Sequence, residues 1–108
     1  KASKPKPVKT TRIENLKAEV RSLTKQDIEN RKLPIGTTGV VITKIDPDSP
    51  INNLALNNII IEVQKKKIKT PGDLVNVIKS SIVAKDKSIL IVIYNNQNQK
   101  SYIGIKLN

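Results

Sequence analysis

The sequence predicts a mainly β domain with two helices, folded as a small, partly open antiparallel barrel or sandwich. Runs of Val, Ile and Leu recur along the chain and are separated by short polar links. Two of those links contain a threonine followed three residues later by an aspartate, which is a signature of a helix start. The chain lacks the regular alternation of strands and helices that accompanies a parallel sheet. The antiparallel class is therefore favoured.

Residues 1–12 are predicted to be a basic linker, and residues 13–108 the folded domain. Lysine and proline alternate in the first segment without any apolar periodicity, and such segments stay extended and solvated. We expect the linker to be dispensable for the stability of the domain. A chain that begins at Lys1 is expected to be a fragment of a longer protein. No apolar run approaches the ~20 residues that cross a bilayer, so membrane insertion is not expected.

The first half of the domain is predicted to contain a strand, a helix and a second strand. Residues 13–23 are read as one strand, because apolar and charged side chains alternate there. Thr24 and Asp27 form a capping box, so a short helix should follow. Both glycines of the loop at 34–39 are expected at positive φ. The aliphatic run at 40–45 is the first central strand.

The second half begins with turn chemistry at residues 46–50, where Ser49 is expected to cap a brief helix. The continuous aliphatic run at 59–63 is typical of a strand buried on both faces. Thr70 and Asp73 flank a proline at the first helical position, which predicts the second main helix. Beyond it, residues 87–94 and 100–107 are predicted to pair as a hairpin.

The composition excludes several kinds of chemistry in this chain. It contains no His and no Cys, so a Ser–His–Asp triad and metal sites built from imidazole or thiolate are impossible. The carboxylates are not grouped at metal-binding spacings, and no glycine-rich phosphate loop occurs. We therefore expect neither an active site nor a cofactor in these residues.

The net charge of +11 keeps nucleic-acid binding open as an alternative. Five of the basic residues lie in the first twelve positions, and the others are scattered. Nucleic-acid binders usually combine a basic face with aromatic platforms, whereas this chain has only two tyrosines. A solvated basic surface is the favoured interpretation, and no nucleic-acid partner is expected.

Several stretches in a fixed order resemble a PDZ domain of the bacterial HtrA/Do-like serine proteases, and in particular the second, C-terminal one. They are GVVITKIDPDSP, NNLALNNIIIEVQKKKI, TPGDLVNVIKS and the closing hairpin. The resemblance covers roughly residues 14–108. Asparagines at 53 and 57 stand where the family pattern has glycines, and asparagine tolerates left-handed backbone best among the other residues. Gln64-Lys65 replaces Asn-Gly, which makes a less comfortable turn.

The resemblance implies a permuted strand order and a non-catalytic peptide-binding module. An extended hydrophobic C-terminal peptide would add to a strand edge by β-augmentation, for substrate recognition or regulation. The implied parent is a periplasmic, trypsin-like serine endopeptidase. Implied partners are the C-termini of peptides or unfolded proteins, and other domains or subunits of that protease.

The resemblance also implies a set of site residues. The carboxylate-binding loop falls on residues 15–18, the peptide-pairing strand on residues 19–23, and the second wall on the helix from Pro71. The expected peptide-binding residues are Asn15, Leu16, Lys17, Ala18, Glu19, Val20, Arg21, Val75 and Ile78. On the helix, Leu74 and Val77 are expected to face the core instead. Two alternatives remain: the apolar members of the set are plain core residues, or the groove is degenerate and the domain mediates contacts between protease subunits.

Overall fold

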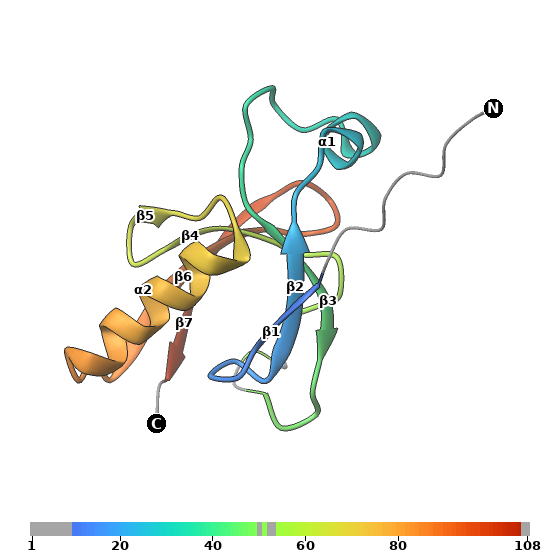
Figure 1. The fold of residues 1–108 in the computed structure, drawn as a ribbon. Coiled ribbons are helices and arrows are strands. Elements are labelled where there is room, and N and C mark those ends of the chain that lie inside the picture. The colour runs from blue at the N-terminus through green and yellow to red at the C-terminus, as the bar shows by residue number, and fades with distance from the viewer. Residues whose placement is uncertain (1–9, 50, 52–53, 107–108) are drawn as a thin grey trace.

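The computed structural model describes residues 10–49, 51 and 54–106. Within them the chain forms a mainly β domain with two helices, which confirms the predicted fold class (Figure 1). The elements are β1 (Thr11–Ile13), β2 (Ala18–Ser22), α1 (Lys25–Arg31), β3 (Val40–Ile45), β4 (Ile59–Val63), β5 (Lys66–Lys67), α2 (Pro71–Val83), β6 (Ser88–Tyr94) and β7 (Lys100–Lys106). Neither helix in the described residues is long and apolar enough to span a membrane.

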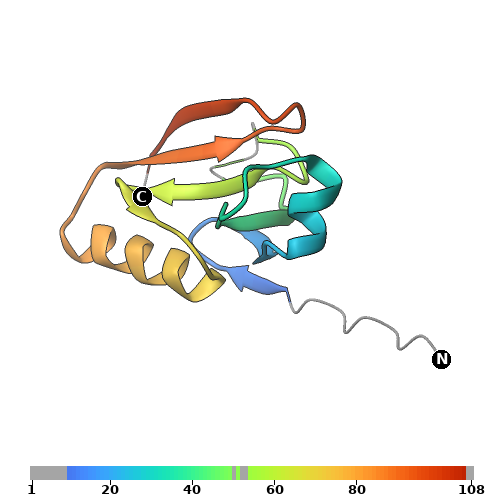
Figure 2. The ribbon, with the colours of Figure 1, turned by 90° about the horizontal axis from the view of Figure 1, so that it is seen from above.

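All strand pairs are antiparallel, and the sheet runs β1-β2-β3-β4-β6-β7, with the short β5 beside β4. The sheet curls without closing, so β1 and β7 are its two ends. Figure 2 shows α2 and β1 on one side of the curled sheet and the β6–β7 hairpin on the opposite side. The predicted partly open antiparallel barrel is confirmed.

Two aliphatic clusters hold the sheet. The larger one packs side chains of α2 against β1–β4, β6 and β7, and the smaller one lies under the segment around α1. Successive residues of β4 divide between them, since Ile60 enters the larger cluster and Ile59 the smaller. This is the burial on both faces that the unbroken aliphatic run predicts.

Both helix starts follow the predicted capping chemistry. The Thr24 hydroxyl accepts a hydrogen bond from the Asp27 amide, and the Asp27 carboxylate accepts one from the Thr24 amide. Thr70 and Asp73 make the same reciprocal pair, with Pro71 at the first helical position. Each box satisfies amide groups that a helix N-terminus otherwise leaves without partners.

The beginning of the domain differs from the prediction. Residues 13–23 are not one strand, because the chain turns at residues 14–17 and β1 folds back on β2. The predicted linker boundary at residue 12 therefore falls inside β1, while residues 1–9 lie outside the described part. The helix expected after Ser49 concerns residues 50, 52 and 53, which are outside it as well.

Several turns use left-handed backbone, both where the residue type predicts it, at Asn57 and Gly36, and where it does not, at Gln64 and Lys65. Asn57 has a φ of 72°, Gly36 of 90°, and Gln64 and Lys65 of 53° and 67°. Gly39 differs, because it is not among the residues at positive φ. It is required for space instead, since a Cβ would lie 2.6 Å from the carbonyl oxygen of Ile60. The predicted glycine substitute at Asn53 lies outside the described residues.

Candidate functional site

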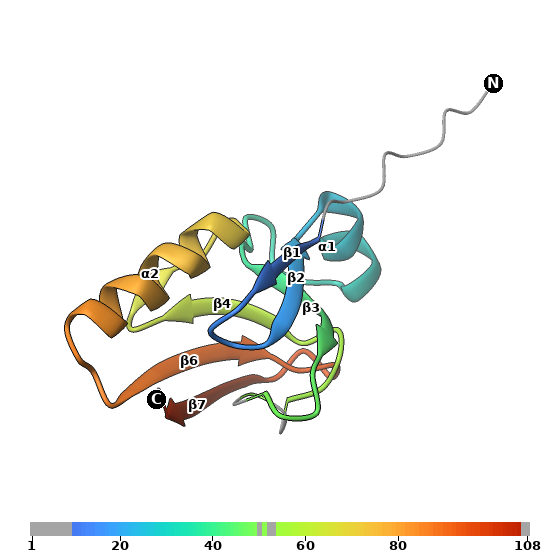
Figure 3. The same ribbon diagram turned by 60° about the horizontal axis from the view of Figure 1, so that its bottom comes forward.

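The candidate site is the edge of β2 that faces α2, and β1 occupies it. One edge of β2 pairs with β3, and the other pairs with β1 in the register Thr11↔Val20, Arg12↔Glu19 and Ile13↔Ala18. Helix α2 contacts both β1 and β2. In Figures 1 and 3, β1 lies on the side of β2 that faces this helix.

The side chain of Ile13 fills the apolar part of this site. It is 2% exposed and belongs to the same cluster as Val20, Leu74 and Ile78, all completely buried. Burying one isoleucine side chain stabilises a structure by about 1.5–3 kcal/mol. Ile13 therefore supplies much of what holds this three-residue strand in place.

The turn between β1 and β2 is held by hydrogen bonds within it and by one from Ser49. The amide of Leu16 donates to the carbonyl of Ile13 (3.0 Å), and that of Lys17 donates to the carbonyl of Glu14 (3.2 Å). The buried Ser49 hydroxyl donates to the Leu16 carbonyl and accepts from the Ile51 amide. Two amides of the predicted carboxylate-binding loop are therefore already bonded within the chain.

Ion pairs surround the same turn. The guanidinium of Arg12 contacts Asp46 at 2.7 Å and Glu14 at 2.6 Å, and Lys17 Nζ lies 2.8 Å from Asp48 Oδ2. Hydrogen bonds from Arg12 and Lys17 lower the pKa values of Asp46 and Asp48, respectively. The Asp48 carboxylate in turn raises the pKa of Lys17. The contact between Arg12 and Asp46 ties β1 to the end of β3.

The structure brings most of the predicted site residues together. Asn15, Leu16 and Lys17 form the turn, and Ala18, Glu19 and Val20 form the start of β2. Of these, Leu16, Ala18 and Val20 are buried in the large cluster, which Val75 also contacts. Arg21 is directed elsewhere: it forms a two-bonded ion pair with Asp27 of α1, at 2.6 and 3.0 Å.

Burial alone does not separate a core face of α2 from a groove face. Ile78 is as buried as Leu74, whereas Val75 and Val77 are both half-buried against the cluster. The physical reason is that β1 covers the side of the helix that was expected to be open. Whether these residues bind a peptide remains a prediction.

Sequence reasoning missed the residues contributed by β1 and by the loop after β3. They are Thr11, Arg12, Ile13, Asp46 and Asp48. The sequence pattern places the first two in the linker and explains the two aspartates as turn residues alone. The one available signal was the isoleucine at 13 beside a basic residue, at the start of an apolar alternation.

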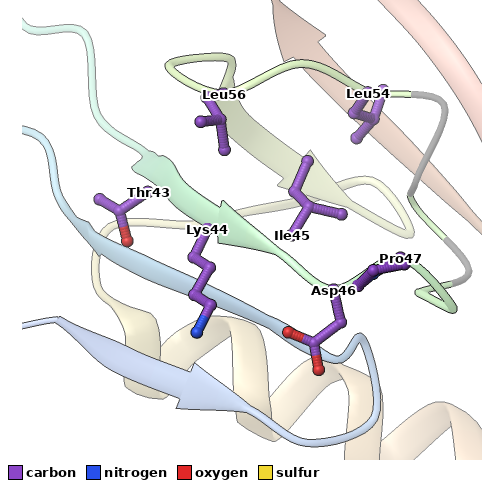
Figure 4. A pocket seen from close by; sticks show the side chains of 7 residues that line it. All are labelled: Thr43, Lys44, Ile45, Asp46, Pro47, Leu54 and Leu56. Atoms are coloured by element: carbon purple, nitrogen blue, oxygen red, sulfur yellow. The ribbon is translucent and has the colours of Figure 1, made fainter.

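A hollow lies beside the end of β3, with a volume of about 330 Å³. Figure 4 shows Ile45, Leu54 and Leu56 gathered on one side of β3, while Lys44 and Asp46 point to the other side, toward β1 and β2. Asp46 is bonded to Arg12, so this hollow borders the β1 site. It is a shallow depression rather than an enclosed cavity.

Comparisons with known proteins agree with this fold. No family model matches the sequence, and no curated protein matches it. Among solved structures, an HtrA-type protease, AlgW, solved with a decapeptide, has a similar fold, with a TM-score of 0.62 and 23% sequence identity. The chain has the fold of part of an HtrA-type protease. The match covers 94% of this chain and 29% of that protein, so the PDZ-like fold is established while the activity of the larger protein is not transferred.

Proposed function

We propose that this chain is a non-catalytic PDZ module of an HtrA/Do-like serine endopeptidase, and that it binds extended hydrophobic C-terminal peptides along β2. The observation that carries the proposal is that this edge of β2 already holds an extended strand and a buried aliphatic side chain, Ile13. β-Augmentation uses those same two features, a strand edge for main-chain hydrogen bonds and a pocket for a side chain. The decapeptide in the AlgW structure supports a peptide as the class of ligand.

The biological setting is part of the same proposal. The sequence resemblance supports a periplasmic parent protease with a separate catalytic domain, which this module serves by recognising substrates or by regulation. The partners are then the C-termini of peptides or unfolded proteins, together with other parts of the protease.

A second candidate function is assembly, in which the groove stays closed and the domain contacts other domains or subunits. The pairing of β1 with β2 favours it, because the strand edge and the amides of Leu16 and Lys17 are already bonded. Fold alone does not separate the two functions, since function depends on the site.

Fluorescence anisotropy separates these candidates and the nucleic-acid alternative. The chain is titrated against a labelled pentapeptide ending in valine with a free carboxylate, with the C-terminal amide of the same peptide as control. Peptide binding should saturate, favour the free carboxylate and change little with salt. Binding to a DNA duplex, measured in parallel, would weaken steeply with salt. β1 is tethered to this edge at an effective concentration of about 1 mM. Failure of peptide binding to saturate at several times that concentration would contradict the proposal.

A further inference from the structure

Strand β1 lies where an incoming peptide would have to lie. A strand has two edges, and β3 takes one of those of β2. β1 takes the other, antiparallel to β2 and running toward the turn at residues 14–17. An external strand can therefore reach the edge opposite Ala18–Val20 only after β1 has left it.

Carboxylates gather around β1 in a domain that is otherwise basic; Lys17 pairs with one of them and Lys44 stands opposite another. Of the nine acidic residues in a chain of net charge +11, four lie in the turn after β1, on its partner strand β2 or in the loop after β3 that contacts Arg12 and Lys17. They are Glu14, Glu19, Asp46 and Asp48. Arg12 contacts two of them and stands opposite a third, Glu19, and opposite charges on cross-strand neighbours attract. The site is thus suited to a cation beside the buried side chain.

β1 carries the two kinds of side chain that this site accommodates, an aliphatic one and a basic one. It presents an isoleucine that is 2% exposed, next to α2, and immediately before it an arginine held by carboxylates. The strand has only three residues, and Ile13 is its one buried side chain. Such a short strand can detach without unfolding the remaining sheet.

We propose that β1 is the resident occupant of the peptide groove, and that a partner segment must replace it with the same chemistry: an aliphatic residue preceded by a basic one. This inference rests on the proposed function and adds the preferred class of ligand and a competitor within the chain. Because β1 is tethered through a short turn, its effective concentration is on the order of 1 mM. The intact chain should therefore bind a matching peptide weakly, and release of β1 should strengthen binding.

A disulfide between β1 and β2 tests the exchange. Arg12 and Glu19 are direct cross-strand partners; the Cβ atoms of such partners are about 4.5–5.5 Å apart, at the upper end of the separation that a disulfide spans. In the variant Arg12→Cys/Glu19→Cys this is the only disulfide that can form within the chain, because the natural sequence has no cysteine. Oxidation locks β1 onto β2, whereas reduction frees it and leaves it without the Arg12 contacts. The matched control is Ser88→Cys/Lys106→Cys, a cross-strand pair on β6 and β7.

The probe is the labelled pentapeptide KTTRI with a free carboxylate, which copies residues 9–13. We expect the reduced variant to bind it at least about tenfold more tightly than the oxidised one, and the control pair to bind equally in both states. The peptide KTTEI, with the charge reversed, should bind the reduced variant several-fold more weakly, since Asp46 and Glu14 then repel it.

The other possible outcomes contradict either the competition by β1, the preference for a basic residue or the proposed function. Equal affinity in the two redox states, or failure of the disulfide to form, would overturn the competition by β1 and leave the proposed function standing. Equal binding of KTTRI and KTTEI would overturn the preference for a basic residue. Absence of binding in both states, with amide exchange on β2 accelerated by reduction, would show an open groove without a ligand and overturn the proposed function itself.

Discussion

Gly39 stands at the start of β3 against the backbone of β4. A Cβ at this position would lie 2.6 Å from the carbonyl oxygen of Ile60 and 2.9 Å from Cγ2 of Ile59. The first of these atoms belongs to a paired strand in the centre of the sheet and has little room to move. The close approach of the two chains therefore depends on the missing side chain.

We expect Gly39→Ala to lower the free energy of unfolding by about 2 kcal/mol, as overpacking does. Urea denaturation measures the change. The control is Gly104→Ala in β7, where an added Cβ meets nothing within 4 Å, so stability should change by less than about 0.5 kcal/mol. Equal stability of the two variants would contradict the close contact between β3 and β4.

Ile78 lies on the side of α2 that packs against the sheet and β1, and it is completely buried. We expect Ile78→Glu to destabilise the domain by about 3 kcal/mol or more, because it places an unpaired carboxylate among aliphatic side chains. Val83→Glu, at an 82% exposed position of the same helix, should be nearly neutral. A stable Ile78→Glu variant would mean that this side of α2 is open to water.

At the scale of elements, the β1–β2 hairpin shows where sequence reasoning stopped. Its turn contains Leu16, which is buried, and Lys17, which takes a φ of 49°. Neither is a turn-forming residue, so the alternation of apolar residues ran through the turn without a visible break. The elements that were predicted well have explicit local signals, such as the capping boxes at Thr24 and Thr70.

Helix α1 is joined to β2 by the ion pair between Arg21 and Asp27. The hydrogen bond from Arg21, with further bonds from the Thr24 amide and hydroxyl, lowers the pKa of Asp27 to about 2. The side chains of Arg21 and Asp27 are only 23% and 18% exposed, so water screens the pair partially. In the unfolded chain the Asp27 pKa returns to about 3.9.

The folded state favours the ionised Asp27 carboxylate, so the free energy of unfolding falls as acid protonates this group. Its contribution is complete above about pH 5 and is lost as the pH falls toward about 2, with a total on the order of 2 kcal/mol. We expect denaturation of Asp27→Asn to show a flatter acid limb in this window than the parent. Glu29→Gln, at an exposed position of the same helix, should keep the parent slope. Identical acid limbs for the parent and Asp27→Asn would contradict the ion pair.

The order of strands and helices along the chain could be predicted because each element carries its own pattern. The pairing of β1 with the edge of β2 could not be predicted. It depends on contacts between residues far apart in the chain, such as Arg12 with Asp46 and Ile13 with α2, and no local pattern reports them. Sequence reasoning therefore places the candidate site on β2 and α2, which the structure brings together, but without β1, the segment that covers this edge.

The sheet has a second end at β7, which offers an alternative edge for an added strand. β7 pairs with β6 on one side, and no strand of the described residues pairs with its other side. Its exposed residues include Tyr102, which is 67% exposed, and the terminal lysines of the strand. A peptide that simply adds to any free edge would bind here, so the location of binding decides between specific recognition and edge pairing.

The most direct test of the account is therefore to map amide chemical shifts while the ¹⁵N-labelled chain is titrated with the KTTRI peptide. The account predicts that the largest changes fall on β2 and the facing residues of α2, Val75 and Ile78, together with loss of the hairpin resonances of β1. Shifts concentrated on β7 or around the hollow beside β3, with β1 unchanged, would contradict it.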